Sequence, residues 1–503
     1  MSRTVREMEH IQHWIDGRLT SGESSATSPV FNPATGHQSA EVCLATATDV
    51  DRAVDSARAA ATAWRRTSLA TRSKVLFAFR QLLVEHTDEL AALITAEHGK
   101  VLPDAAGEIA RGLENVEYAC GIPNLLKGDF TEQASSGVDV YSIKQPVGVV
   151  AGITPFNFPV MVPLWMCAGS IACGNAFILK PSEKDPSASL LLARLWQEAG
   201  LPDGVFTVLQ GDKIAVDGLL QHDDVDAVSF VGSTPIAQYI YETGTRAGKR
   251  VQALGGAKNH MMVLPDADLD VAADAAVSAA YGAAGERCMA VSVVVAVGAV
   301  ADPLIDAIKD RLPSLRIGPG DQEGSEMGPL ITAEHRDKVI DYIDRGEQAG
   351  AKVVVDGRTG RSDSGFFLGC TLLDDVSPEN VAYTDEIFGP VLAVVRVPSY
   401  DDGLDLINSH RFANGTAIFT RDGGAVRQFQ FDVQVGMIGV NVPIPVPVGY
   451  YSFGGWKASL FGDTHMYGPE GINFNTRRKV VTSRWPDPGT SRIDLGFPTN
   501  GEH

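Results

Sequence analysis

The amino-acid sequence predicts an α/β fold, in which helical crossovers connect parallel strands. Two observations lead to this prediction. The chain has 503 residues, which is too long for one ordinary hydrophobic core and indicates two or three domains. Short apolar runs also alternate with amphipathic segments over residues 147–256 and again over 257–455, a pattern typical of parallel strands joined by helices. We therefore expect two α/β domains.

The segment before the first alternation is predicted to be helical. Thr48 with Asp51 resembles a capping box at the start of residues 48–98, and Gly99 would end this region. Glycine-containing polar turns between β-branched runs predict a protruding hairpin around residues 130–150. Near the end of the chain, "GINFNTRRKVVTS" is expected to add an edge strand.

Each alternation supplies its own set of expected strands. In the first they are "VGVVAGI", "AFILK", "GVFTVLQG", "AVSFVG" and "RVQAL", with helices from about Pro159 and through "ASLLLARLWQEAG" and "IAQYIYETG". In the second they are "MMVL", "VSVVVAVG", "AKVVVDG", "PVLAVVRV", "TAIFT" and "MIGVNV". Open α/β sheets bind ligands where such strands end, so the residues after each run are the candidates for a site.

Composition excludes several classes of protein. Hydrophobic residues make up 44% and charged residues 21%, the mix of a soluble globular protein. The net charge of -20 argues against nucleic acid or an anionic membrane as a partner. The most apolar stretch, residues 158–180, is interrupted by prolines and glycines, so we expect a helix, a turn and a strand there instead of a membrane span.

The cysteines point to a reducing compartment. The six cysteines form no C-x-x-C pair and show no metal-ligand spacing with histidine, so we expect neither disulfides nor a metal site. The amino end has no apolar core of the length that a signal peptide needs, and its acidic residues are unlike a transit peptide. The expected location is the cytoplasm.

Cys288 is the first candidate for chemistry. A single buried cysteine most often packs as a small hydrophobic residue. Cys288, however, follows the small-residue turn "GAAGER", where backbone N–H groups can approach a ligand closely. Arg287 beside it would stabilise a thiolate or bind an anionic substrate.

Further candidates follow the predicted strands. Asn157 in "ITPFNFP" would donate its amide to a developing oxyanion, although loop asparagines more often stabilise turns. Lys180 and Glu183 in "LKPSEKDP" suit ribose hydroxyls or a phosphate, and a solvated turn explains them equally well. Gly232 and Ser233 stand at the beginning of a helix, a position suited to pyrophosphate. The sequence contains no GxGxxG, Walker, HExxH or GxSxG motif.

Six motifs in order carry a family resemblance. "TPFNFP", "LKPSE", "FVGS", "GERCMA", "EIFGP" and "SFGGWKAS" together resemble the NAD(P)-dependent aldehyde dehydrogenase superfamily across nearly the whole chain. The resemblance implies an aldehyde dehydrogenase-like fold with a Rossmann-like NAD-binding domain of residues 1–129 and 147–256. It further implies an α/β catalytic domain of residues 257–455 and a small β oligomerisation element of residues 130–146 and 470–485. The expected assembly is a homotetramer, a dimer of dimers.

The resemblance also assigns roles to the candidate residues. Cys288 would add to the aldehyde, and Asn157 with the backbone N–H of Cys288 would form the oxyanion hole. Hydride transfer to the nicotinamide would then leave a thioester. Lys180 and Glu183 would hold the adenosine ribose, which favours NAD over NADP because a carboxylate repels a 2'-phosphate. The other residues expected to contact the cofactor are Thr154, Phe156, Lys184, Gly232, Ser233, Gly255, Glu386 and Phe388.

The chain departs from the family at the residue that activates water. Hydrolytic members carry a glutamate in an "ELGGK"-like motif, whereas this chain has "QALGGAKNH", with Leu254 or Ala253 at that place. A second family glutamate falls on Thr464 in "KASLFGDTH". Without a base to activate water, a thioester would persist until a thiol attacks it.

The missing water-activating glutamates indicate one branch of this superfamily. "GAKNH", "GAAGERCMA", "GVNVPIPVP" and "FGDTHMYGPEGINF" resemble the CoA-acylating methylmalonate-semialdehyde dehydrogenases. The implied reaction converts methylmalonate or malonate semialdehyde, NAD and CoA into propionyl-CoA or acetyl-CoA, carbon dioxide and NADH, as in the breakdown of valine, β-alanine or inositol. Arg111 and Arg287 match the arginines of this branch and would bind the substrate carboxylate, although a helical arginine such as Arg111 is more often merely exposed. The alternatives are a hydrolytic aldehyde dehydrogenase and a non-catalytic relative.

Overall fold

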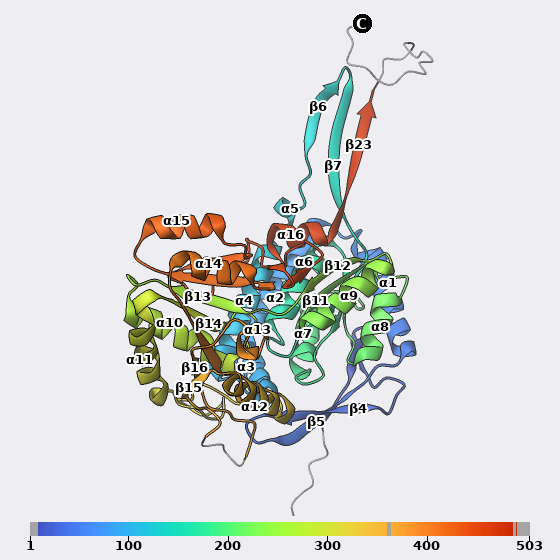
Figure 1. The fold of residues 1–503 in the computed structure, drawn as a ribbon. Coiled ribbons are helices and arrows are strands. Elements are labelled where there is room, and N and C mark those ends of the chain that lie inside the picture. The colour runs from blue at the N-terminus through green and yellow to red at the C-terminus, as the bar shows by residue number, and fades with distance from the viewer. Residues whose placement is uncertain (1–8, 360–363, 486–488, 490–503) are drawn as a thin grey trace, which may run out of the picture.

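The computed structural model describes residues 9–359, 364–485 and 489. Residues 1–8, which open the expected NAD-binding domain, lie outside the described residues. Two large, mostly parallel sheets with helices packed against them form the body of the molecule, and a three-stranded arm projects from it (Figure 1). The α/β prediction is therefore confirmed.

The first sheet has eight strands in the order β22-β12-β11-β8-β9-β10-β2-β3. Its parallel centre contains all the strands expected from the first alternation, namely β8 (Val149–Ile153), β9 (Ala176–Lys180), β10 (Phe206–Val208), β11 (Ala227–Val231) and β12 (Arg250–Leu254). The short antiparallel edge strands are β2 (His13–Ile15), β3 (Arg18–Thr20) and β22 (Leu460–Phe461). Strand order reverses at β8, which pairs with both β9 and β11, and ligands bind at such reversals in open α/β sheets.

Helices cover both faces of this sheet because its central strands are apolar on both sides. In β8, Val149 and Ala151 join the core beneath one set of helices, whereas Val150 joins the core on the opposite face. The helices of the first face are α1 (Ala47–Trp64), α8 (Lys213–Gln221) and α9 (Thr234–Arg246). The helices of the second face are α2 (Leu69–Glu85), α3 (Thr87–His98), α4 (Leu102–Cys120), α6 (Met161–Cys173) and α7 (Ser187–Glu198). Gly99 ends α3 in the left-handed conformation, as predicted.

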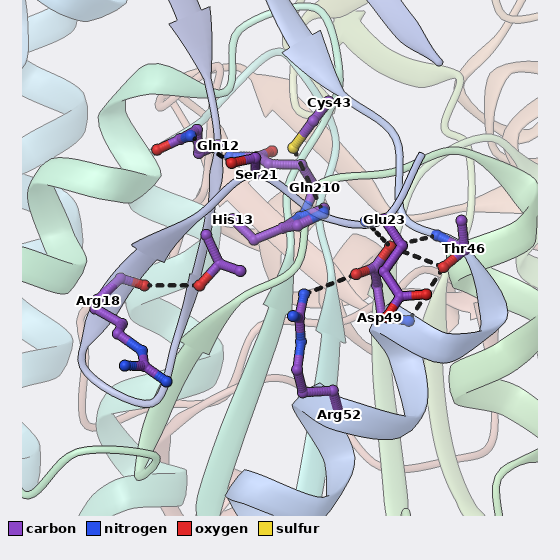
Figure 2. A network of polar contacts seen from close by, with 11 residues as sticks. Gln12, His13, Arg18, Ser21, Glu23, Cys43, Thr46, Asp49, Arg52 and Gln210 are labelled. Carbon is purple, nitrogen blue, oxygen red and sulfur yellow. Dashed lines mark hydrogen bonds and ion pairs between the residues drawn. The ribbon is translucent and has the colours of Figure 1, made fainter. Parts of the chain in front are cut away.

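The start of the first helix differs from the prediction by two residues. Thr46, not Thr48, caps α1, and the carboxylate of Asp49, not Asp51, completes the capping box by accepting from the Thr46 backbone N–H. Both pairs fit the same spacing. The earlier pair forms because Asp49 also accepts from the Glu23 backbone N–H and pairs with Arg52, as Figure 2 shows.

The same view shows how the amino-terminal strands attach to the first sheet. The His13 ring accepts at Nδ1 from the backbone N–H of Gln210, and its Nε2 lies 3.5 Å from Cys43 Sγ (Figure 2). Burial lowers the pKa of His13 to about 4 and raises the pKa of Cys43 to about 11, so both groups are neutral. Cys43 is therefore a structural thiol.

The second sheet has seven strands in the order β15-β16-β17-β14-β13-β19-β20. Its strands are β13 (Asn259–Val263), β14 (Val291–Val297), β15 (Lys352–Val355), β16 (Thr371–Asp374), β17 (Val391–Val397), β19 (Gly415–Phe419) and β20 (Met437–Val440). Only β15 is antiparallel to its neighbour, and only β16 was absent from the predicted set. The accompanying helices are α10 (Leu269–Tyr281), α11 (Ala301–Arg311), α12 (Ala333–Gln348), α13 (Val381–Thr384), α14 (Tyr400–Ser409) and α15 (Gly423–Asp432).

The arm confirms the expected hairpin and edge strand. Its strands are β6 (Phe130–Ser135), β7 (Val138–Pro146) and β23 (Thr476–Arg484), with β7 in the centre (Figure 1). The expected strand 470–485 begins later than predicted, because helix α16 (Gly468–Phe474) occupies its first residues and packs on α6. The minor elements are β1 (Glu9–Ile11), β4 (Thr27–Asn32), β5 (His37–Cys43), α5 (Ile122–Leu125), η1 (Gly282–Gly285), η2 (Gly298–Val300), η3 (Leu312–Ser314), β18 (Phe412–Ala413) and β21 (Trp456–Lys457). No helix among the described residues is both long enough and apolar enough to cross a membrane.

Candidate active site

Cys288 lies in the short connection between η1 and β14. All six cysteines are within the described residues and are free, and Cys288 alone among them is partly exposed. Burial, and next the negative charge of Glu386, raises the pKa of Cys288 to about 12. The thiol is therefore protonated at neutral pH, and its reactivity depends on groups that stabilise the thiolate when ligands bind.

The turn before Cys288 has an unusual backbone. Ala283, Ala284 and Gly285 all have positive φ, at 50°, 54° and 75°. Alanine in this left-handed region costs about 1 kcal/mol or more per residue, and strain of this kind concentrates at functional sites. A Cβ at Gly285 would lie 2.2 Å from the carbonyl oxygen of Gly389, so only glycine allows the turn to pack against the "EIFGP" segment.

Three asparagine amides hold the backbone around Cys288. Asn157 Nδ2 donates to the carbonyl of Glu286 at 3.0 Å, which uses one of its two N–H bonds and leaves the other for a ligand. Asn259 and Asn414 donate to the carbonyl of Cys288 at 2.9 and 3.3 Å. Asn259 and Asn414 were not among the predicted site residues, although Asn259 belongs to the "GAKNH" motif.

A buried ion pair supports Asn157 from behind. Lys100 Nζ donates to the carboxylate of Glu108 at 2.7 Å and to the backbone carbonyl of Asn157 at 2.6 Å, and both charged side chains are almost fully buried. The other Glu108 oxygen accepts from the backbone N–H groups of Val160 and Met161 at the start of α6. The loop that carries Asn157 is thus fixed at both ends by charge-assisted hydrogen bonds.

Residues expected to bind the cofactor gather where β8, β9 and β11 end. Lys180, the last residue of β9, lies 3.4 Å from the Glu183 carboxylate. Burial alone would raise the pKa of Glu183, but the charge of Lys180 brings the net pKa below its ordinary value, so Glu183 is ionised. Thr154 follows β8, and its buried hydroxyl has no hydrogen-bond partner. The backbone N–H of Lys184 bonds the Ser182 hydroxyl.

The beginning of α9 is arranged for an anion. Ser233 is the N-cap residue of α9, is exposed, and makes no side-chain bond to its own helix. Gly232 precedes it, and the dipole of a helix favours phosphate groups at its start. Together with the ionised Glu183, this arrangement fits a dinucleotide whose pyrophosphate lies at α9 and whose ribose hydroxyls reach the carboxylate.

Glu386 connects the two sheets at the site. Its carboxylate accepts from the backbone N–H of Ala257 at 2.8 Å, and burial raises its pKa to about 7. A Cβ at Gly256 would lie 2.4 Å from Glu386 Oε2, so the absence of a side chain at Gly256 leaves room for the carboxylate. Gly255 donates to the carbonyl of Ser459. Lys258 Nζ fixes the same segment by donating to the carbonyls of Ala382 and Asp385.

Phe156 and Phe388 face each other beside this carboxylate. Their ring centroids are 5.8 Å apart in an edge-to-face arrangement. Phe388 has a positive φ of 60°, and its carbonyl accepts from His335 Nε2 at 2.7 Å. The structure therefore brings together two residues that were each expected to contact the cofactor, and it adds His335 as a contact that the sequence did not reveal.

The two arginines expected to bind substrate are both engaged with acidic side chains. Arg287 Nη2 donates to both oxygens of Asp104, at 2.6 and 2.7 Å. Arg111 Nη1 donates to Glu114, and its Nη2 donates to the carbonyl of Val446. Ile444 lines the same cavity as Arg287, so the loop around residues 444–446 passes both arginines.

The family to which the chain belongs follows from one comparison. Residues 19–481 match the aldehyde dehydrogenase family. The chain belongs to this family. The family resemblance and the fold expected from it are therefore confirmed.

Relatives of this aldehyde dehydrogenase include semialdehyde enzymes. The chain is 56% identical to a malonate-semialdehyde dehydrogenase of Pseudomonas aeruginosa PAO1, over 98% of this chain and 100% of the relative. A methylmalonate-semialdehyde dehydrogenase structure from Oceanimonas doudoroffii is 55% identical with a TM-score of 0.94, covering 96% of this chain and 99% of that one. A structure from Sinorhizobium meliloti, described as such a dehydrogenase in complex with NAD, is 53% identical with a TM-score of 0.95, covering 96% and 100%.

At the positions expected for water-activating glutamates, namely Ala253 or Leu254 and Thr464, this aldehyde dehydrogenase has no acidic residue. Leu254 is the last residue of β12, is 3% exposed, and pairs with Leu460 of β22. Ala253 beside it is fully buried. The backbone carbonyl of Thr464 accepts a hydrogen bond from Gln252 Nε2 at 2.8 Å.

We expect the Lys100–Glu108 pair to contribute strongly to stability. Lys100→Met would leave the buried Glu108 carboxylate without its cation and lower the free energy of unfolding by about 3–5 kcal/mol. The double variant Lys100→Met/Glu108→Gln removes that isolated charge and should recover part of the loss. Urea denaturation of the unmodified protein, the single variants Lys100→Met and Glu108→Gln, and the double variant measures this, and a double variant as unstable as the sum of the two single changes would contradict the coupling.

Proposed function

We propose that this protein oxidises malonate or methylmalonate semialdehyde with NAD and transfers the acyl group to CoA. One combination of observations carries the proposal. Cys288 lies beside the Asn157 amide, which can donate to an oxyanion, and the positions expected for water-activating acids hold Ala253, Leu254 and Thr464 instead. The names of the relatives that match the full chain support the substrate. The products would be acetyl-CoA or propionyl-CoA, carbon dioxide and NADH.

In the proposed reaction, Cys288 adds to the aldehyde carbon as a thiolate. Asn157 Nδ2 and the backbone N–H of Cys288 donate to the oxyanion, and the Glu286 carbonyl keeps the asparagine amide in orientation. Bound NAD accepts the hydride, which leaves an acyl group on the cysteine sulfur. The CoA thiolate then displaces Cys288 from the thioester, while the substrate carboxylate leaves as carbon dioxide and the resulting enolate is protonated.

The contacts proposed for NAD come mainly from the expected NAD-binding domain, residues 1–129 and 147–256, and from Glu386 of the expected catalytic domain, residues 257–455. Ser233 and Gly232 would bind pyrophosphate, and Lys180 with Glu183 would bind the adenosine ribose. Thr154, Phe156, Lys184, Gly255 and Phe388 would complete the site. Arg111 and Arg287 would bind the substrate carboxylate.

The proposed assembly is a homotetramer, formed through the arm. The free edge of β23 and the exposed Phe130, Val480 and Trp485 are consistent with strand-to-strand association, since monomers seldom leave such an edge unprotected. The free cysteines are consistent with a cytoplasmic location.

The deciding experiment measures NADH formation from malonate semialdehyde with and without CoA and identifies the acyl product by mass. We expect turnover to require CoA and to give acetyl-CoA. NADH formation at full rate without CoA, together with a free acid, would instead identify a hydrolytic aldehyde dehydrogenase and would contradict the acyl-transfer step.

A further inference from the structure

The guanidinium of Arg287 is fixed by contacts on two sides. Both oxygens of Asp104 accept from its Nη2, and the two side chains remain 22% and 28% exposed. On the other side, a Cβ at Gly282 would lie 2.6 Å from Arg287 Nη1, so the group lies directly against the turn that precedes Cys288. Arg287 therefore already has a carboxylate partner before any substrate arrives.

The pair lines a cavity of about 520 Å³. The second arginine in its wall, Arg311, is itself bound to Asp270 and Asp274. Glu326, also in the wall, pairs with Arg316. Arg287 and Arg311, the two arginines among the residues described as lining this cavity, are thus both paired with acidic side chains. Neither guanidinium is unpaired when an anionic ligand arrives.

A substrate carboxylate that approached Arg287 with Asp104 in place would have to share the guanidinium with Asp104, whose like charge weakens the binding of a second carboxylate. Asp104 lies in the first turn of α4 and is partly exposed, so its side chain can turn to solvent at little cost. We propose that Asp104 is an internal counter-ion that the substrate carboxylate displaces from Arg287. The exchange sets the KM for carboxylated aldehydes and leaves neutral aldehydes unaffected.

This inference rests on the proposed function and has its own test. The variant Asp104→Asn keeps the shape of the side chain and removes the competing charge. We expect its KM for malonate semialdehyde and the inhibition constant of malonate to fall about fivefold, which corresponds to the interaction free energy of a strong exposed ion pair. The KM for propanal should stay unchanged within twofold. Glu117→Gln removes one charge from the same helix at an exposed pair with Arg80 and is the matched control.

The variants separate the possible outcomes. Asp104→Glu keeps the ion pair and should restore the KM of the unmodified enzyme, whereas Asp104→Ser should behave like Asp104→Asn. A KM for malonate semialdehyde that rises or stays constant in both Asp104→Asn and Asp104→Ser would overturn the inference and make Asp104 an orienting partner. Failure of the proposed function shows separately, in the unmodified enzyme, as CoA-independent release of a free acid.

Discussion

The variant Cys288→Ala is expected to lose NADH formation by at least about 10⁴-fold, because no other described side chain at the site replaces the nucleophile. Binding of NAD should persist, since the residues proposed to hold it belong to the ends of β8, β9 and β11 and to the start of α9. NADH release in stopped-flow assays and NAD binding by calorimetry measure the two properties separately.

Cys120→Ala is the matched control for this change. Cys120 is buried at the end of α4, whereas Cys288 is partly exposed, so access to reagents and substrate distinguishes the two thiols. Its loss should leave turnover within twofold. Turnover retained in Cys288→Ala, or iodoacetamide labelling of Cys288 no faster than that of Cys120 when NAD is bound, would instead favour a non-catalytic or differently organised protein.

Asn157→Ala should lower kcat by about 10²- to 10³-fold with little change in KM, as expected for a donor that acts mainly on the developing oxyanion. The change also removes the bond to the Glu286 carbonyl, so a control must separate positioning from catalysis. Asn414→Ala removes the bonds to the Cys288 carbonyl and to Met289 Sδ and should reduce kcat by roughly tenfold or less.

Steady-state kinetics with malonate semialdehyde, NAD and CoA decide between these roles. If the two asparagine variants lost equal activity, Asn157 would only position the backbone. A rise in KM at constant kcat would place the Asn157 amide in ground-state binding instead.

The order of strands and helices was predictable because strands that are buried on both faces appear in the sequence as continuous apolar runs between amphipathic segments. Each run from "VGVVAGI" to "MIGVNV" became a strand of one of the two sheets. β16 was missed because Thr371–Asp374 contains only two apolar residues, Leu372 and Leu373, between polar ends, which is too few to show a strand pattern. The capping box was misplaced because "TATDVD" offers the same spacing twice, and only contacts to Glu23 and Arg52 select the first.

The candidate site was predictable to the extent that its residues follow strands. Asn157, Lys180 and Ser233 stand at strand ends that parallel pairing brings to one edge. The supporting contacts were not predictable, because they join residues far apart in the chain: Lys100 reaches Asn157 across 57 residues, and Asn414 reaches Cys288 across 126. Nor could spacing show that Arg287 and Asp104 neutralise each other, since their contact spans 183 residues.

The arm has a consequence for how the protein is made. β7 pairs along its full length with β23, the last strand described, and Asn175 donates to the carbonyl of Asn475 across 300 residues of chain. At ordinary rates of translation, roughly 15 to 60 s pass between the synthesis of these partners. One hydrogen-bonding edge of β7 is therefore unpaired during that time while the chain is on the ribosome. The first sheet likewise lacks its edge strand β22 until that part of the chain is synthesised. The domain that begins the chain is completed last, so the nascent protein depends on protection from chaperones until its end emerges.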